Sequence, residues 1–268
     1  MTLHQLLIVS LIQGLTEFLP VSSSGHLILI PSLTGGPDQG LAIDVAVHVG
    51  TLLAVILYFR REVSEASAGL LRLAKGKVDT RGAHTALLLI VATIPVLLVG
   101  FVLKLTGLSD MLRSVVVIGW TMLLFGLVLY WADRTGSKER TAHDWTMRHA
   151  VWMGLAQALA LIPGTSRSGI TITAARRLGY DREGAATLSM LMSIPTILAS
   201  GALLSLDVIG EADGALLHDA SIAAAFAFVA ALFALVLMMR LLRSVSFTPY
   251  VIYRVILGII LLVYGYSA

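Results

Sequence analysis

Six segments of 18 to 22 residues are almost wholly apolar, and they constrain the fold more than any other feature of this chain. A helix needs about 20 apolar residues to cross a bilayer, and strands of a membrane barrel would show alternation over about 10 residues instead. Only 13% of the chain is charged, against roughly 25% in soluble domains. The pattern predicts an all-α polytopic membrane protein with transmembrane helices at 41–59, 86–103, 114–131, 185–206, 220–239 and 248–265.

Two further apolar segments are too broken to cross a membrane. The run 6–19 stops at Pro20, passes through three serines, and resumes at 27–33. The run 150–162 stops at Pro163 and resumes at 170–175. Runs of 10 to 14 apolar residues are typical of re-entrant or buried helices. We therefore expect two re-entrant helical hairpins, at 3–33 and 149–178.

The order of these elements repeats along the chain. Each hairpin is followed by three spans, and the two interrupting prolines are 143 positions apart. Because three spans separate the hairpins, the second half must enter the membrane from the opposite face. The order predicts one integral membrane domain, 1–268, built as an inverted-topology repeat with halves 1–131 and 149–268. Interrupted helices at matching positions of such halves indicate a binding site near the membrane midplane.

The distribution of the basic residues indicates how the chain is oriented in the membrane. Of the 19 Lys and Arg residues, 15 fall between spans on one predicted face and only Lys104 and Arg113 on the other. An excess of basic residues marks the cytoplasmic side. We expect a multi-pass protein of the cytoplasmic (inner) membrane whose site opens toward the outer face. The chain has no cysteine, which excludes disulfides and a thiol nucleophile.

Ionisable side chains at membrane depth indicate function, because each is costly to bury there. The two apolar runs are interrupted at residues 20–26 and 163–169, and we call these two segments the breaks. Glu17, His26 and Arg167 lie in or beside them. The glycines and hydroxyls around them suit helix N-termini, which bind anions, and a guanidinium matches phosphate oxygens. A simple buried Glu17–Arg167 pair is the alternative, as is helix capping for the hydroxyls of the second break. The candidate phosphate-binding residues are Ser22, Ser24, Gly25, Gly164, Thr165, Ser166 and Ser168.

Two pairs of side chains four residues apart extend the candidate site. Gln13 and Glu17 share a helix face and are candidate metal ligands. Oxygen ligands without cysteine favour Mg²⁺ or Ca²⁺. Asp44 and His48 form the second pair, and we assign them a supporting role, with a mutually satisfied polar pair as an equal alternative.

The two broken segments resemble known signature motifs. Residues 13–26, QGLTEFLPVSSSGH, and 163–169, PGTSRSG, are similar to those of the bacterial undecaprenyl-diphosphate phosphatase family of the bacitracin-resistance type. The resemblance implies a hydrolase that removes the terminal phosphate of undecaprenyl diphosphate and recycles the lipid carrier for cell-wall synthesis, with Mg²⁺ or Ca²⁺ as cofactor. It implies an acidic motif at Gln13 and Glu17, although many members have Glu where this chain has Gln13.

By the same resemblance, Ser23 and His26 form the nucleophile and acid/base region, and Arg167 binds phosphate. We expect Ser23 to attack, with His26 as base or stabiliser and Glu17 orienting the metal or the histidine. The rival is direct attack by His26. The expected partners are the bilayer and a polyprenyl diphosphate lipid, with a homodimer as a possible assembly and no nucleic acid.

Other classes of function are weaker alternatives. A flippase or transporter of an anionic polyprenyl lipid is the main one, because inverted repeats with broken helices are typical of transporters. An intramembrane serine protease would have no use for Arg167. A phosphatidate-phosphatase pattern would need a histidine six residues after that arginine, where the chain has Thr173.

Overall fold

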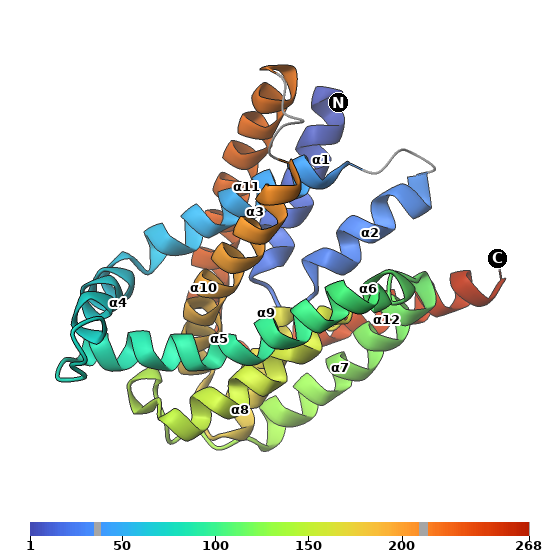
Figure 1. The fold of residues 1–268 in the computed structure, drawn as a ribbon. Helices are drawn as coiled ribbons and strands as arrows, with labels where there is room; N and C mark the ends of the chain where they lie inside the picture. Colours follow the sequence, from blue (N-terminus) through green and yellow to red (C-terminus); the bar gives the residue numbers. More distant parts are fainter. Residues whose placement is uncertain (35–38, 209–213, 268) are drawn as a thin grey trace.

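The computed structural model describes residues 1–34, 39–208 and 214–267, and these residues fold almost entirely into helices (Figure 1). The α-helices are α1 (Leu3–Glu17), α2 (Ser23–Thr34), α3 (Leu41–Tyr58), α4 (Arg60–Leu73), α5 (Arg81–Thr106), α6 (Leu108–Met111), α7 (Val115–Thr135), α8 (Met147–Ala158), α9 (Arg167–Arg177), α10 (Arg182–Val208), α11 (Gly214–Leu241) and α12 (Thr248–Ser267). Two short 3₁₀ turns, η1 (Ala142–Asp144) and η2 (Leu159–Leu161), precede α8 and follow it.

The six predicted spans are confirmed as helices. Among the described residues, six helices, α3, α5, α7, α10, α11 and α12, are long and apolar enough to cross a membrane. Several begin or end outside the predicted apolar limits. For example, α5 starts at Arg81, where the Thr80 hydroxyl accepts a hydrogen bond from the Ala83 amide. A side-chain cap of this kind satisfies an amide that the helix itself leaves unpaired, so capping sets this boundary.

One helix was not expected. The segment 60–82 lies between the first two predicted spans and carries six of the basic residues, yet α4 forms within it. Its sequence carries charges on one side and leucines, valine and alanines on the other, as an amphipathic helix does. It packs against α5 through glycines, since a β-carbon on Gly82 would lie 2.0 Å from the Glu65 carbonyl oxygen. Lateral packing, which a hydropathy scan does not see, therefore stabilises this helix.

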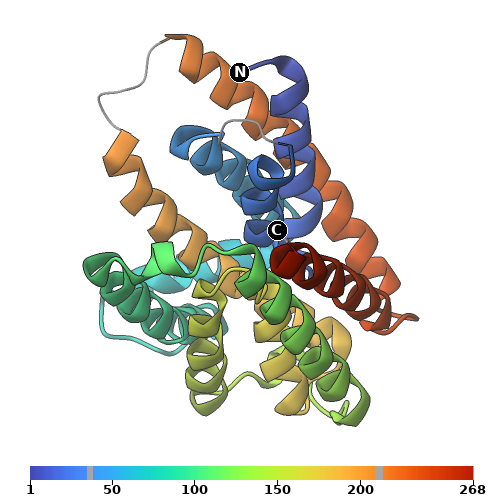
Figure 2. The same ribbon diagram turned by 90° about the vertical axis from the view of Figure 1, so that its right-hand side faces the viewer.

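The long helices pack in neighbouring pairs that are distant in sequence. Helix α11 lies along α1 and α3, and α12 lies along α7, as the orange, blue, red and green ribbons of Figure 2 show. Helices α5 and α8 form a further pair. The main apolar core is formed by buried side chains of α3, α5, α7, α8, α9, α10, α11 and α12, with α10 contributing the most.

A buried charge cluster joins the ends of α7, α9, α10 and α12. It lies on the side that carries most of the basic residues between the spans, which we call the basic face. Asp133 of α7 accepts hydrogen bonds from Arg176 Nε at 3.2 Å and from Arg182 Nε at 2.8 Å. It also accepts one from the backbone amide of Phe247. The carboxylate thereby ties α7 to α9, α10 and the start of α12. Buried charges require such partners, because desolvation is costly.

Candidate active site

The two breaks in the apolar runs meet at the centre of the protein. In Figure 1, α1 and α2 form a V whose apex lies next to α9. The Ser168 hydroxyl donates to the Leu19 carbonyl oxygen at 2.9 Å, and a β-carbon on Gly25 would lie 3.4 Å from the α-carbon of Gly164. The second break also rests on α7, where Thr121 Oγ1 donates to the Pro163 carbonyl oxygen at 2.6 Å. The end of α1 and the start of α2 thus pack directly on the segment that leads from η2 into α9.

Glu17 is the centre of the contacts between the breaks. Its Oε2 accepts hydrogen bonds from Ser23 Oγ at 2.5 Å and from Gln13 Nε2 at 2.9 Å. Its Oε1 accepts from Arg167 Nη2 at 2.7 Å. One carboxylate therefore joins the first helix, the first break and the start of α9. Charge-assisted bonds of this kind are stronger than neutral ones, so the carboxylate fixes the serine and the guanidinium in a shared geometry.

Matching backbone turns place Ser23 and Arg167 at this carboxylate. Ser22 has a φ of 72° and Ser166 a φ of 70°, in the left-handed region that non-glycine residues rarely adopt. Each serine precedes the first residue of a helix, and each hydroxyl accepts a hydrogen bond from the amide three residues on, that of Gly25 or Gly169. The chain therefore reverses sharply and starts a capped helix. Ser23 and Arg167 are the residues that follow these turns.

A cavity of about 250 Å³ lies in front of these groups. We call it the break cavity. The predicted residues Glu17, Ser22, Ser23, Ser24, Ser166, Arg167 and His48 line it, together with Val96, Ala160, Leu161, Thr196, Ile197 and Ser200. Glu17 and Ser23 are each 9% exposed, so both are largely shielded yet reachable. A hydroxyl, a carboxylate and a guanidinium meet at the wall of one cavity, and these are groups that phosphoryl transfer can use.

Four of the predicted phosphate ligands do not line the cavity. Gly25 and Gly164 allow the two breaks to approach, and Ser168 bonds to Leu19, as described above. Thr165 is fully buried, and its hydroxyl has no hydrogen-bond partner among the described residues. In this structure these residues hold the breaks together, and their contact with a ligand remains a prediction.

His26 contacts groups other than the hydroxyl of the predicted nucleophile, Ser23. Its Nδ1 is 2.7 Å from the Ser22 carbonyl oxygen and its Nε2 is 2.6 Å from the Tyr253 hydroxyl. The two rings are stacked, with centroids 5.7 Å apart. Because a carbonyl only accepts, Nδ1 carries the proton and Nε2 accepts from the tyrosine. Both ring nitrogens are thus engaged, and His26 is not among the residues that line the break cavity. Its acid/base role stays a prediction.

His48 is the imidazole that lines the cavity. Its Nε2 lies 3.9 Å from Glu17 Oε2. Its Nδ1 is 2.7 Å from the backbone carbonyl oxygen of Asp44, so the predicted pair interacts through the Asp44 backbone. The Asp44 carboxylate instead accepts from Gln39 Nε2 at 2.8 Å. The bond to the carbonyl puts the proton of the neutral ring on Nδ1 and leaves Nε2 as an acceptor facing the site.

Several residues of the site were missed by sequence reasoning. Thr196 and Ser200 supply hydroxyls to the cavity from α10, and Arg167 Nη1 donates to the Ser189 carbonyl oxygen at 3.3 Å. Tyr253 holds His26, and its neighbour Arg254 contacts both breaks. Arg254 was not missed, because it is the one Lys or Arg within the apolar segment 248–265, and the sequence predicts that it pairs with a buried acceptor or a backbone carbonyl rather than acting in catalysis. The structure places its guanidinium on backbone carbonyl oxygens. Isolated hydroxyls within an apolar helix carry no such signal.

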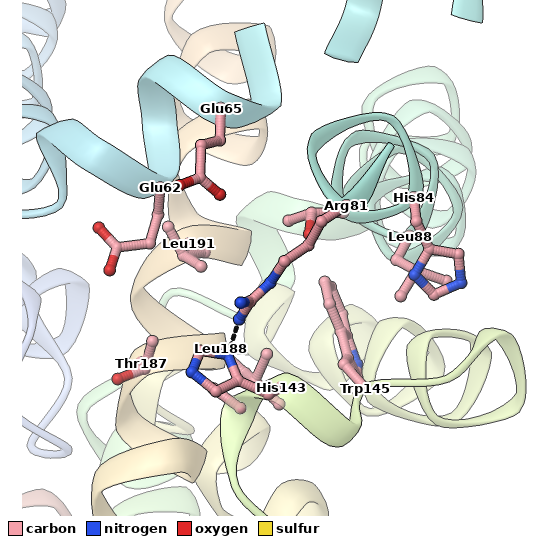
Figure 3. A pocket seen from close by; sticks show the side chains of 12 residues that line it. Glu62, Glu65, Arg81, His84, Leu88, His143, Trp145, Thr187, Leu188 and Leu191 are labelled. Carbon is pink, nitrogen blue, oxygen red and sulfur yellow. Dashed lines mark hydrogen bonds between the residues drawn. The ribbon is translucent and has the colours of Figure 1, made fainter. Parts of the chain in front are cut away.

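A second polar cavity, of about 90 Å³, lies between α4, the start of α5, η1 and α10 (Figure 3). Glu62 and Glu65 extend from α4 on one side, and the Arg81 guanidinium points toward His143, with which it is in contact. This cavity shares no lining residue with the break cavity and contains none of the predicted site residues. The break cavity is therefore the candidate active site.

Comparisons with known proteins show which family this chain belongs to. The family model described as bacitracin resistance protein BacA matches residues 6–260. The chain is 73% identical to the undecaprenyl-diphosphatase of Roseobacter denitrificans and 69% identical to that of Dinoroseobacter shibae, in both cases over all of both chains. It is 48% identical to the undecaprenyl-diphosphatase of Chromohalobacter salexigens, over 95% of this chain and 96% of that protein.

Proposed function

The chain belongs to the bacitracin resistance protein BacA family, and we infer from this membership that it is an undecaprenyl-diphosphatase. It hydrolyses the terminal phosphate of undecaprenyl diphosphate, yielding undecaprenyl phosphate and orthophosphate. The observation that supports this chemistry most directly is the shared carboxylate. Glu17 meets the Ser23 hydroxyl and the Arg167 guanidinium at the wall of one cavity.

We propose that Ser23 is the nucleophile. Its Oγ attacks the terminal phosphorus while its proton passes to Glu17 Oε2, 2.5 Å away. The bond from that phosphorus to the bridging oxygen breaks, and undecaprenyl phosphate leaves. Water then attacks the phosphoserine, the P–Oγ bond breaks, and orthophosphate is released with a proton returned to Ser23. Such transfers depend mainly on positioning and on stabilising charge on the phosphoryl oxygens.

We propose that Arg167 provides most of that charge stabilisation. It lines the cavity, and its Nη2 and Nη1 are held by Glu17 and by the Ser189 carbonyl oxygen. The hydroxyls of Ser22, Ser24 and Ser166 line the same wall and can donate to phosphate oxygens. A guanidinium fixed on two sides loses little freedom when it binds an anion, which favours preorganised stabilisation.

We propose that a divalent cation, Mg²⁺ or Ca²⁺, binds at Glu17. Within the described ranges there is no group of three or more His, Asp or Glu side chains that could hold a metal. The residues nevertheless fit an ion that takes its remaining ligands from substrate phosphates and water, as Mg²⁺ usually does. Gln13 Oε1 is fully buried and has no hydrogen-bond partner among the described residues. It could accept from the hydration shell of such an ion, whose charge would offset that of the diphosphate.

We propose that the fold is an inverted repeat of two halves with re-entrant hairpins. Positions 144 apart correspond: Ser22 with Ser166, both with positive φ, and Ser23 with Arg167, both bonded to Glu17. Gln13 and Gln157 also correspond, and both are fully buried with an unpartnered Oε1. In each half, the first helix of the hairpin packs on the second span of the other half: α1 packs on α11, and α8 packs on α5. Helices α1, α2, α8 and α9 have at most 15 residues, or about 23 Å, too short to cross.

We propose that the cavity opens toward the outer face of the cytoplasmic membrane. Its α10 residues, Thr196, Ile197 and Ser200, lie in the second half of a helix that begins at Arg182 on the basic face. In Figure 1 the N-terminus, α6 and the C-terminus lie away from α4 and its basic surroundings. A homodimer remains a prediction.

Release of orthophosphate from undecaprenyl diphosphate by the purified protein in detergent, with Mg²⁺ or Ca²⁺ present, tests the proposed function. We expect release that Arg167→Ala reduces by at least about 100-fold, because an aligned cation in a dry site supplies several kcal/mol. Binding and transbilayer movement of the lipid without release of orthophosphate would instead indicate a transporter.

A further inference from the structure

Arg254 of α12 is fully buried, and it donates to five backbone carbonyl oxygens. Nε bonds to Met122 at 3.2 Å, Nη1 to Pro20 at 3.3 Å, and Nη2 to Thr121, Gly164 and Thr165 at 3.2, 3.1 and 2.9 Å. Its contacts in the described residues are thus to the backbone. A guanidinium in a membrane span is costly unless its donors are satisfied, and here carbonyl oxygens satisfy them.

These carbonyls belong to the two breaks and to the helix beneath them. Pro20 lies in the first break, Gly164 and Thr165 in the second, and the other two acceptors in α7. The fit is close, since a β-carbon on Gly169 would lie 2.8 Å from Arg254 Nη1. One side chain therefore fastens both breaks to α7 and α12.

The segments that Arg254 holds are strained. The two non-glycine residues with positive φ in the described chain are Ser22 and Ser166. Arg254 binds the carbonyl two residues before the first and the carbonyl directly before the second. Rare backbone conformations persist only where surrounding structure fixes them. Arg254, which we call the clamp, is well placed to fix the backbone conformations of Ser22 and Ser166.

The clamp also orients a backbone donor. The N–H and C=O of a trans peptide point in opposite directions. Because the Thr165 carbonyl points at Arg254, the Ser166 amide of the same peptide points away from it. Ser166 lines the break cavity. Glu17, Arg167 and Arg254 together carry one negative and two positive charges at the breaks, which favours an anion.

We propose that Arg254 is a positioning residue for phosphoryl transfer. It fixes the turns that present Ser23 and Arg167, orients the Ser166 amide toward a phosphate oxygen, and adds positive charge behind the site. The proposal rests on the proposed phosphatase function, because the positioned groups are those that act on the diphosphate.

Arg176 provides a matched control. It is also fully buried, and it donates to the carbonyl oxygens of Asp133, Gly136, Ser137 and Tyr180. It differs in having a carboxylate partner, Asp133, and none of its partners lines the break cavity. Loss of either arginine should destabilise the fold, but only loss of Arg254 should disturb the site.

The experiment compares R254K, R254Q and R176K with wild type in detergent. Thermal unfolding is measured for each, and kcat and KM for undecaprenyl diphosphate are measured well below each Tm. Lys retains the charge but cannot bond five carbonyls, whereas Gln removes the charge. We expect both Arg254 variants to lower kcat per folded protein at least about tenfold, with a rise in KM that is larger in R254Q. R176K should lower Tm and change kcat less than twofold.

A folded R254K or R254Q protein with kcat within twofold of wild type would overturn the proposal. If neither variant folds, the rate of backbone amide hydrogen exchange in the wild-type protein without substrate tests the proposal instead. A working clamp requires slow exchange in both residues 20–25 and residues 163–169. Fast exchange in either segment would also overturn it. Wild-type protein that releases no orthophosphate would refute the phosphatase function instead, whatever the exchange pattern.

Discussion

Arg167 Nη2 donates to Glu17 Oε1 at 2.7 Å, although 150 positions separate the two residues. The contact joins the two breaks and leaves the other carboxylate oxygen to Ser23 and Gln13. It is largely buried, with side chains 13% and 8% exposed. A pair in this setting aligns groups from distant parts of the chain, and its loss should affect both stability and turnover.

Glu17→Gln should abolish turnover and destabilise the protein. The substitution removes the proton acceptor of Ser23 and leaves a buried guanidinium without its anion, which costs about 3 kcal/mol in comparable pairs. Phosphate release and thermal unfolding in detergent check both effects. Arg182→Gln, which breaks a pair with Asp133 on the basic face, is the control. It should lower Tm while kcat remains near wild type, and an inactive but stable R182Q protein would contradict the separation of site and scaffold.

Ser23→Ala should reduce kcat by at least about 1,000-fold, because a nucleophile that forms a covalent intermediate cannot be replaced by a methyl group. Ser24→Ala is the neighbouring control. Its hydroxyl lines the same cavity but lies 3.5 Å from Ser22 Oγ and is not among the hydrogen-bond partners of Glu17 in the described residues. We expect S24A to change kcat less than tenfold. Near-normal turnover in S23A with an inactive His26→Ala protein would reverse the assignment.

His48→Ala should lower kcat by at least about tenfold, because its imidazole faces the carboxylate that accepts the Ser23 proton, and a group that assists proton transfer typically contributes more than that. Its Nε2 faces Glu17 across 3.9 Å, and it lines the cavity. Tyr253→Phe is the comparison, because it removes the hydrogen bond to His26 Nε2. If His26 mainly shapes the first break, Y253F should cost about 1 kcal/mol of stability with kcat nearly unchanged. A strong kcat defect in Y253F with normal turnover in H48A would favour His26 as the base.

Removal of divalent cations with EDTA should abolish phosphate release, and added Mg²⁺ or Ca²⁺ should restore it. Gln13→Leu should raise the cation concentration needed for half-maximal rate, because it removes the buried amide oxygen beside Glu17. Gln157→Leu is the matched control, since Gln157 is equally buried and bonds to the Ala92 carbonyl oxygen, outside the cavity lining. An unchanged cation requirement in Q13L, or full activity in EDTA, would contradict a metal at this position.

The spans were predictable from sequence because hydropathy decides them. Helix α4 was not, since its charged residues mask a face that only lateral packing on α5 reveals. The convergence of Glu17 and Arg167 could be expected from the repeated order of elements, while the exact contacts could not. The roles of the two histidines show the limit most clearly. His26 lies three residues after Ser23 in the same helix, but its ring nitrogens contact the Ser22 carbonyl oxygen and the hydroxyl of Tyr253, which lies 227 positions away in α12 and cannot be anticipated from local spacing.

The most direct test of the central claim is the fate of the transferred phosphate. Wild-type protein is mixed with undecaprenyl diphosphate carrying a radioactive terminal phosphate, quenched within one turnover, and digested. We expect an acid-stable label on the peptide that contains Ser23, absent in S23A and in Arg167→Ala. An acid-labile label at His26, or rapid release of orthophosphate with no covalent label at any time, would contradict Ser23 as the nucleophile of this site.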